Sequence, residues 1–507
     1  MSRINNLNSL VAQRFLSHQN RALSKSLERL STGLAINRGA DNPAGLIASE
    51  KLRSNIAKVE GAIANAERAE QVVNIAEGGL TEVSSLLVEL QSLVTEAGSE
   101  AGLSEEEKEA NQTQIDGILQ TIDRIASTTS FAGVKLLNGA YDFQTSAGSL
   151  DNRVLDFQIN GAKLGTSSQI VNVIITQSAQ HGGLFLSTNG ALNLNNSAAH
   201  RLVLEVAGTE GTREFSFASG TTITDIRDSI NSFSEVTGVS ATLSGTGVRL
   251  MSSELGSDRF VSVDVISDGQ INTPAANTGI YVLSSNDENT IRSATDNTDF
   301  SAVTTAIRDD GLDVGAVING VTARGDGAEI SINNDGLDLS ITLSSTGNGA
   351  QILDSFTAFG ITGGGAVFNL GPDVNIHNQI RLGIQNVAAR NLGNSGTGFL
   401  DDLGAGQTAN VVNGSVSTAQ NIVDAAIDQV TLLRGRLGAF QKFVIGSTIR
   451  SLGIELENTK AAESIIRDTD FAAETAELTR RQVLVAAASN SLNIANSQAT
   501  SVLGLLQ

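Results

Sequence analysis

The fold is decided by one long apolar stripe at residues 52–94, which read LRSNIAKVEGAIANAERAEQVVNIAEGGLTEVSSLLVELQSLV. Apolar side chains return there at steps of three and four residues, a pattern that predicts one continuous helix. A mean step of about 3.5 residues is typical of a coiled-coil seam, which a helix must bury against another helix. The predicted seam residues are Leu52, Ile56, Val59, Ile63, Val73, Leu80, Val83, Leu87, Leu90 and Val94.

A shorter helical stripe precedes the long one, at residues 4–34. It is expected to end at Gly33 and the Asp41-Asn42-Pro43 run, because glycine and proline commonly follow the last turn of a helix. Its predicted seam residues are Leu23, Leu27, Leu30 and Leu34.

Local sequence adds two details to this amino-terminal helical region. Gly78-Gly79 predicts a soft spot inside the long helix, since glycine in a helix interior costs about 1 kcal/mol relative to alanine. Ser104 followed by Glu107 is a capping box, which predicts the start of a third helix. That helix would carry Ile115, Ile118, Ile122 and Ile125 on one face.

The carboxy-terminal end repeats the coiled-coil pattern. A seam runs from residue 422 to 456 and becomes less regular after Val444, while the final segment carries apolar residues at intervals of seven. Both ends of the chain are therefore predicted to be coiled-coil helices. The seam residues predicted here are Val430, Leu433, Leu437, Phe440, Val444, Leu478, Val485, Leu492, Leu503 and Leu506.

The middle of the chain, from about residue 150 to 404, has the period of strands. Apolar and polar residues alternate there, as at Leu337, Leu339, Ile341 and Leu343. Gly-rich punctuation between such runs predicts hairpins within small α+β modules. Two short helices are also expected, one at Ile226, Ile230 and Phe233 and another at Ile352, Phe356 and Phe359.

These patterns predict a multidomain α+β protein. Both chain ends form an antiparallel coiled-coil helical bundle, and strand-rich α+β domains are inserted in the middle. The expected division is residues 1–44 with 456–507 as a terminal coiled-coil segment disordered in the monomer, 45–175 with 405–455 as a helical shaft with a small β-turn region, and 176–290 and 291–404 as two outer variable domains.

Composition excludes several classes of function. The net charge of -21 repels phosphate backbones and anionic lipids, so neither nucleic acid nor a membrane surface is expected as a partner. The four histidines are scattered and there is no cysteine, which leaves no candidate metal cluster or thiol nucleophile. No supporting motif indicates a catalytic site or a cofactor, and no enzyme is predicted. Neither a cleavable signal nor a membrane span is expected, so export would need a route that reads no such signal.

Terminal seams of this kind indicate assembly. Apolar burial contributes about 25 cal/mol per Å², which favours covering a seam that one chain leaves open with another copy. A contact that repeats without closing into a ring gives an open helical filament. A closed bundle receptor or a trimeric adhesin would also use terminal coiled coils, and the pattern alone leaves these open.

Several motifs resemble the terminal signatures of bacterial flagellins. At the amino-terminal end these are LSTGLAIN at 30–37, DNPAG at 41–45 and FAGVKLL at 131–137. At the other end they are RLGA at 436–439, AESIIRDTDFA at 462–472, and Ala495-Asn496 with VLGLL at 502–506. The stretch 225–263 resembles a small motif in the insertions of flagellins and hook-associated proteins.

The resemblance implies a secreted, extracellular structural subunit that polymerises into the flagellar filament for swimming motility. It implies export as an unfolded chain through the flagellar type III gate, an export chaperone on the carboxy-terminal helices, and growth under a filament cap next to hook-associated proteins. It implies no cofactor.

The same resemblance marks three positions where an animal innate immune receptor contacts some flagellins. An arginine of the family motif aligns with Glu89 and a glutamate with Gln114, while its leucine is kept as Leu93. Reversing a charge at an interface opposes binding, so weak receptor activation is expected.

Two other functions compete with the filament subunit. A hook–filament junction protein would share both terminal signatures, and a coiled-coil surface adhesin would use the middle modules for binding. Cellular copy number separates the first, and removal of the middle modules separates the second.

Overall fold

The computed structural model divides the chain into two compact units. Unit 1 comprises Met1–Gln71, Phe368–Gln379 and Gly438–Gln507, and unit 2 comprises Val72–Val367 and Ile380–Leu437. The structure describes residues 7–99, 104–146, 151–164, 168–194, 200–271, 278–284, 287–291, 297–334, 336–344 and 350–505.

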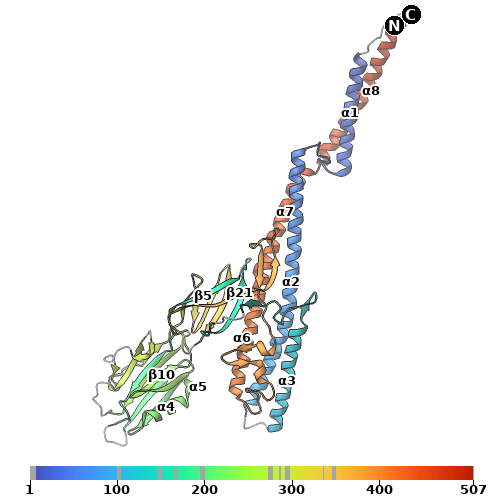
Figure 1. The fold of residues 1–507 in the computed structure, drawn as a ribbon. Coiled ribbons are helices and arrows are strands. Elements are labelled where there is room, and N and C mark those ends of the chain that lie inside the picture. The colour runs from blue at the N-terminus through green and yellow to red at the C-terminus, as the bar shows by residue number, and fades with distance from the viewer. Residues whose placement is uncertain are drawn as a thin grey trace. The chain divides into compact units, whose positions relative to one another are not determined.

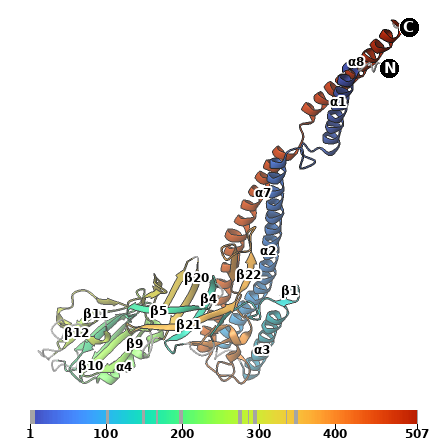
Figure 2. The same ribbon diagram turned by 45° about the horizontal axis from the view of Figure 1, so that its top comes forward.

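Helices dominate unit 1. The helix α1 (Leu7–Thr32) pairs antiparallel with α8 (Phe471–Leu505), and the two lie side by side in Figures 1 and 2. The first half of α2 (Pro43–Ala97) packs on α7 (Gly446–Arg467) through a small core around Val59 and Leu452. No helix of the described residues is long and apolar enough to cross a membrane.

Unit 2 contains a helical bundle made from the second half of α2, α3 (Glu105–Thr128) and α6 (Val416–Ala439). The predicted capping box is confirmed, because the Ser104 hydroxyl accepts from the Glu107 amide and the Glu107 carboxylate accepts from the Ser104 amide. Of the predicted face of α3, Ile115, Ile118 and Ile122 are buried. The predicted helices of both chain ends are thus confirmed.

The helix α2 passes through Gly78-Gly79 without a break, and the predicted soft spot there stays a prediction. A Cβ on Gly78 would meet nothing within 4 Å, whereas one on Gly79 would lie 2.8 Å from Leu137 Cδ1. Gly79 therefore serves close packing and not a bend.

The strands of unit 2 surround two hydrophobic cores. The inner core lies between sheets of order β17-β16-β5-β21-β3 and β18-β19-β20-β4, all antiparallel. Alternation predicted these strands, as on β20, where Leu337, Leu339, Ile341 and Leu343 are all buried. The inner strands are β3 (Phe143–Thr145), β4 (Val154–Ala162), β5 (Gln169–Gln177), β16 (Gly315–Ile318), β17 (Val321–Thr322), β18 (Arg324–Asp326), β19 (Glu329–Asn333), β20 (Leu337–Leu343) and β21 (Ser355–Gly364).

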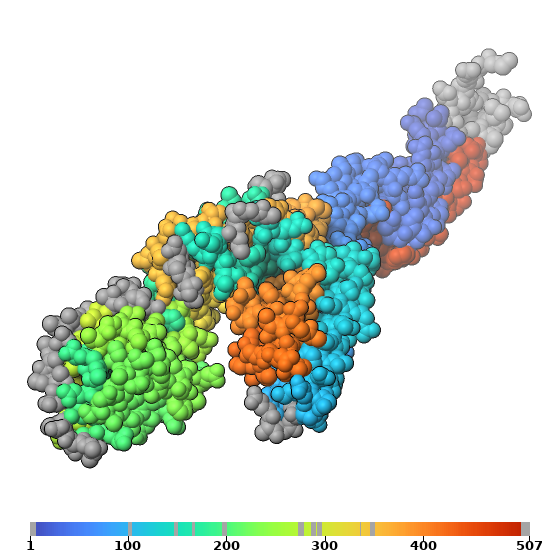
Figure 3. Space-filling model, turned by 60° about the horizontal axis from the view of Figure 1, so that its bottom comes forward, coloured from blue at the N-terminus to red at the C-terminus, as the bar shows by residue number. Residues whose placement is uncertain are grey.

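The outer core lies between sheets of order β13-β12-β6-β10-β9 and β15-β11-β7-β8, with β14 on β12. Its residues are coloured mainly green in Figure 3. The helix α4 (Ile223–Asn231) buries Ile226 and Ile230 in this core, as predicted, and α5 (Ser234–Thr237) follows. The outer strands are β6 (Gly183–Ser187), β7 (Arg201–Ala207), β8 (Thr212–Ala218), β9 (Val239–Ser244), β10 (Gly247–Ser252), β11 (Phe260–Asp268), β12 (Gly279–Ser284), β13 (Asp287–Ile291), β14 (Asn297–Thr298) and β15 (Ile307–Asp310).

Short elements complete the fold. A two-residue turn joins β1 (Ser130–Phe131) to β2 (Val134–Lys135), as the FAGVK stretch suggests. The others are β22 (Ala366–Asn369), β23 (Gln379–Leu382), β24 (Gly393–Asn394) and β25 (Gly398–Phe399), the 3-10 turns η1 (Phe300–Ala302), η2 (Ala389–Asn391) and η3 (Leu400–Leu403), and the π-helix η4 (Phe440–Ile445).

Two predictions for the middle region are corrected. Of the helix predicted at Ile352, Phe356 and Phe359, the two phenylalanines lie in strand β21 and Ile352 precedes it in a bend; a register shift between Thr357 and Phe359 turns Phe356, Ala358 and Phe359 all inward. A bulge of this kind imitates helical spacing. The two cores are also nested in the chain rather than consecutive at 176–290 and 291–404, because the inner core takes residues from both before and after the outer strands. The remaining domain boundaries stay a prediction.

Candidate assembly surface

The terminal helices α1 and α8 are joined by polar contacts along their length. The Ser9 hydroxyl donates to Asn496 Oδ1 at 2.7 Å, and the Arg481 guanidinium donates to Gln19 Oε1 at 3.0 Å. Gln19 is buried, so this hydrogen bond satisfies a polar group that burial would otherwise penalise. Such contacts need both chain ends and fix their antiparallel register.

The LSTGLAIN signature forms the turn after α1. Gly33 adopts a φ of +75°, which glycine tolerates better than other residues, and its carbonyl accepts from the Thr469 amide at 2.9 Å. The Ala35 amide donates to the Arg467 carbonyl at 2.7 Å. The two signatures, far apart in the sequence, therefore meet backbone to backbone in unit 1.

The DNPAG signature begins α2. The Asn42 side chain accepts from the Gly45 amide at 3.0 Å, as a helix N-cap does, and Pro43 is the first helical residue. A Cβ on Gly45 would lie 2.6 Å from Ile36 Cδ1, which explains why a glycine stands there.

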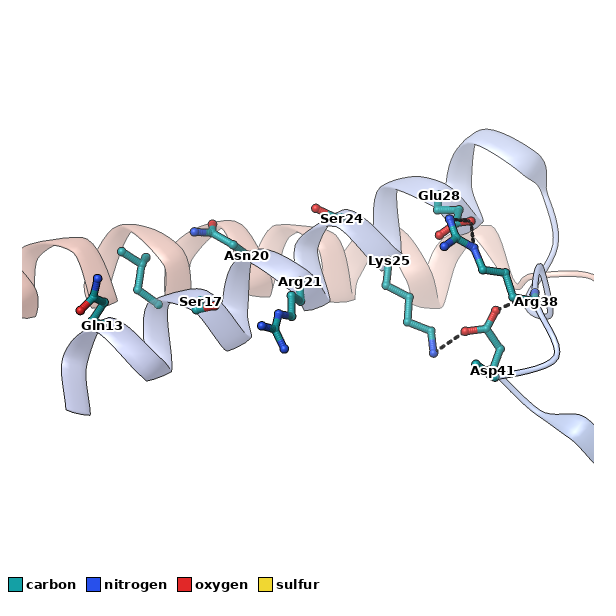
Figure 4. Close-up of a pocket in the computed structure, with 11 residues that line it drawn as sticks. Gln13, Ser17, Asn20, Arg21, Ser24, Lys25, Glu28, Arg38 and Asp41 are labelled. Atoms are coloured by element: carbon teal, nitrogen blue, oxygen red, sulfur yellow. Dashed lines mark hydrogen bonds and ion pairs between the residues drawn. The ribbon is translucent and has the colours of Figure 1, made fainter. Parts of the chain in front are cut away.

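A groove of about 700 Å³ runs between α1 and the turn that follows it, and Figure 4 shows its lining. Lys25 Nζ lies 2.7 Å from Asp41 Oδ1, and Arg38 pairs with Glu28 at 2.8 Å. The hydrogen bond from Lys25, helped by the amides of Arg38 and Asn37, holds the pKa of Asp41 below its ordinary value. These ion pairs tie the turn to α1.

The predicted seam residues fall into a buried group and a half-buried group. Predicted seam residues in the helical bundle of unit 2 are buried, while most of those in α1, in α8 and in the first part of α2 are half-buried. Leu27 is 49% exposed, the side chain of Leu503 is not described and Leu506 lies outside the described residues. The buried members are Val59, Val73, Leu80, Val83, Leu87, Leu90, Val94, Val430, Leu433, Leu437 and Phe440.

The fully buried position of this part of the seam lies one residue beyond Val444. Val444 is half-buried, whereas its neighbour Ile445 is fully buried. The π-helix η4 inserts one residue relative to α-helical winding, so the buried stripe moves from the position of Val444 to that of Ile445. The irregular spacing after Val444 was the signal in the sequence.

Apolar side chains on the terminal helices remain open to solvent within the chain. On α1, Leu7, Leu10 and Val11 are 70%, 56% and 53% exposed, and on α8, Val483 and Ile494 are 63% and 61% exposed. A further groove of about 390 Å³ lies between the two helices and is lined by Asn8, Val11, Ala12, Phe15, Ser491 and Ala495.

The three receptor-contact positions belong to unit 2. Glu89 and Gln114 are exposed, whereas Leu93 is only 8% exposed. The residues of this prediction therefore differ in how far a partner can reach them, and their role stays a prediction.

Sequence reasoning missed the half-buried cation Arg436 of unit 2. It donates to Asn160 Oδ1 and, at 3.0 Å, to the Gly383 carbonyl, so α6 is bound to β4 and to the segment after β23. Desolvation lowers the pKa of Arg436 to about 10, although Asp338 and Asp142 favour its charged form. Only its place in the RLGA signature could have marked it.

Three family models match the chain. They are described as the bacterial flagellin N-terminal helical region, over residues 4–142, the bacterial flagellin C-terminal helical region, over 420–506, and the flagellin hook IN motif, over 201–253. The two helical models cover the terminal helices, and the third covers strands and helices of the outer core.

Curated relatives match along the whole chain. Flagellin B of Helicobacter pylori is 28% identical over 100% of this chain and 99% of its own length. Flagellin of Salmonella typhimurium is 26% identical over 100% of each chain. Among solved structures, the flagellar junction protein FlgL from Legionella pneumophila is 14% identical, covers 83% of this chain and 99% of that chain, and has a TM-score of 0.27.

The helices α1 and α8 come from opposite ends of the chain, pair with each other and carry open apolar faces. These features define the class of structural proteins that form helical assemblies. The chain belongs to the bacterial flagellin family. It is an extracellular structural subunit of the flagellar filament, in which flagellin polymerises for motility.

Proposed function

We propose that assembly belongs to the helices α1, α2, α3, α6, α7 and α8, and that the two strand-rich cores form a separable outer surface. The exposed apolar side chains of α1 and α8 carry this proposal. Leaving Leu7, Leu10 and Val11 in water forfeits burial energy of about 25 cal/mol per Å², which a neighbouring copy would recover.

Order at the chain ends depends on assembly in this proposal. The pair α1–α8 buries few large apolar side chains of its own, since Leu23, Leu30 and Leu492 stay half-buried. Such a pair is marginal until neighbours cover its open faces. The free monomer then loses both ends in limited proteolysis, whereas filaments protect them.

Further partners follow from the family. An export chaperone would hold the carboxy-terminal helices, and the unfolded chain would pass through the type III gate. The cap would lie at one end of the filament and the hook-associated proteins at the other. No catalytic activity is part of the proposal. Activation of the innate immune receptor is weak, because Glu89 places an anion where the family motif has a cation.

Seeded elongation tests the proposal. Purified chain is added to short filament seeds, and growth is followed by electron microscopy for wild type and for Leu10→Glu/Val11→Glu. We expect wild type to extend the seeds and the variant, folded by circular dichroism, to fail. The matched control Ile170→Glu/Ile174→Glu, at exposed positions of β5, should elongate normally. Elongation by the α1 variant at the wild-type rate would refute the role of α1.

A further inference from the structure

Two chain segments connect the outer core to the inner core. They are residues 178–182, between β5 and β6, and residues 311–314, between β15 and β16. The segments pair with each other, because the Gln180 amide donates to the Leu312 carbonyl at 2.9 Å and the Leu312 amide donates to the Gln180 carbonyl at 3.0 Å. Two paired segments can bend and twist together, so they form a hinge if nothing else holds the cores.

A third segment crosses between the two cores. The loop 253–259 joins β10 to β11 of the outer core, yet its Leu255 is only 8% exposed and belongs to the inner core. The loop lies directly on the turn between β18 and β19 of the inner core. A Cβ on Gly256 would stand 3.1 Å from Gly327 Cα, and a Cβ on Gly327 would stand 2.8 Å from the Leu255 carbonyl oxygen. The loop therefore fastens the outer core to the inner core independently of the two connecting segments.

The carboxylate of Asp313 fixes this loop. Its Oδ1 accepts from the Ser257 amide at 2.8 Å and from the Gly327 amide at 2.9 Å, and its Oδ2 accepts from the Ser257 hydroxyl at 2.6 Å. Desolvation acts to raise the pKa of Asp313, but these hydrogen bonds and the nearby Arg324 outweigh it and hold the pKa below its ordinary value. One charged group thus joins the loop of the outer core to the turn of the inner core, through hydrogen bonds of the stronger, charge-assisted kind.

We propose that the loop 253–259 is a releasable latch between the two cores. While Leu255 is buried in the inner core and Asp313 holds Ser257, the outer and inner cores form one body. When the loop leaves the inner core, the outer core turns about the hinge at Gln180 and Leu312. The attachment consists of one leucine and three hydrogen bonds, so it opens without unfolding either core. This inference goes beyond the proposed assembly function, because both cores belong to one chain.

A distance measurement within the monomer tests the latch. The chain has no cysteine, so Ile170→Cys and Thr242→Cys place one spin label at an exposed position of each core. Double electron–electron resonance then gives the distribution of distances between the two labels. The otherwise unchanged chain should give one narrow distribution. Asp313→Ala and Leu255→Ala should each broaden it by about twofold or more, because the outer core then turns about the hinge.

Two matched controls leave the latch in place. Leu164→Ala removes a leucine of the inner core that is also 8% exposed but lies outside the loop, and Asp310→Ala removes an exposed carboxylate that pairs with Arg308 within β15. Both controls should keep the narrow distribution, and circular dichroism verifies that each variant folds.

A milder variant keeps the test decisive. Ser257→Ala removes one exposed hydroxyl donor, so it should broaden the distribution less than Asp313→Ala does, and it takes the place of that variant if Asp313→Ala does not fold. An unchanged width in the latch variants would overturn the latch. So would equal broadening in the controls, or a distribution that is already as broad in the unchanged chain.

Discussion

Gly79 of α2 lies directly against Leu137, which follows the β1–β2 hairpin: a Cβ on this glycine would stand 2.8 Å from Leu137 Cδ1 and 2.9 Å from Thr129 Oγ1. The close approach lets the hairpin region pack on the helix. A Cβ on its neighbour Gly78 would meet nothing within 4 Å. Two adjacent glycines in one helix therefore have different roles.

Substitution of the two glycines should give opposite results. Gly79→Val forces Leu137 or Thr129 to move and should lower the free energy of unfolding by about 1–3 kcal/mol. Gly78→Ala should raise it by up to about 1 kcal/mol, because alanine favours the helix. Denaturant unfolding of both variants measures the difference, and equal effects would contradict the packing role of Gly79.

The π-helix predicts that truncating Ile445 and truncating its neighbour Val444 lower the stability by very different amounts. Ile445→Ala empties a fully buried position and should cost about 2–5 kcal/mol, whereas Val444→Ala removes a half-buried side chain and should cost about 1 kcal/mol or less. Thermal unfolding of the two variants provides the comparison. A larger loss at Val444 would mean that the helix winds without the π-helix.

Two arginines of α6 should differ as strongly. Arg436→Met removes the donor to Asn160 and Gly383 and leaves the half-buried Asp142 carboxyl without its nearby cation, so a loss of about 2–4 kcal/mol is expected. Arg434, paired with Glu77 at 2.9 Å and about one third exposed, should lose about 1 kcal/mol or less on change to Met. Equal losses would show that Arg436 adds nothing beyond an ordinary surface pair.

The turn after α1 should respond to acid through Asp41. Because Lys25 and two amides lower the pKa of this carboxyl in the fold, its contribution to stability is complete above the ordinary value of 3.8 and is lost as the pH falls through the lowered value. The difference in stability between wild type and Asp41→Asn should therefore shrink in acid. In a Lys25→Met background, Asp41→Asn should change the stability less than it does in wild type. A stability difference between wild type and Asp41→Asn that does not depend on pH would rule out a contribution from the charged carboxylate of Asp41.

It should be possible to delete the outer core where the two chain segments that connect it to the inner core lie side by side. Gln180 and Leu312 exchange backbone hydrogen bonds at 2.9 and 3.0 Å, so Gly182 and Gly311 stand close enough to be joined by a short turn. A chain in which residues 183–310 are replaced by Asn-Gly should fold, with some loss from the missing Leu255, and should extend filament seeds. The control is a longer excision that begins at the same residue 183 and runs through Ile361. It removes most inner-core strands and should not fold. A folded excised chain that cannot extend seeds would assign assembly contacts to the outer core.

Sequence period alone predicted the element types at both ends of the chain. Heptad spacing is visible because one face of a helix stays buried over many turns, and the Ser104–Glu107 cap is a local motif that needs no distant partner. In the middle region the same reasoning held for β20 but failed at Phe356 and Phe359. A bulge shifts side chains between faces, and its position depends on the neighbouring strand.

By itself, then, the sequence determined that the chain has helical ends with seams, a strand-rich middle and the terminal signatures of its family. The tertiary structure decided which side chains meet. The Gly33 carbonyl accepts a hydrogen bond from the Thr469 amide, and Arg436 donates one to Asn160. Ile445 is buried rather than Val444. The physical reason is that periodicity reports only whether a face is buried, whereas contacts between residues hundreds of positions apart depend on how the completed elements pack.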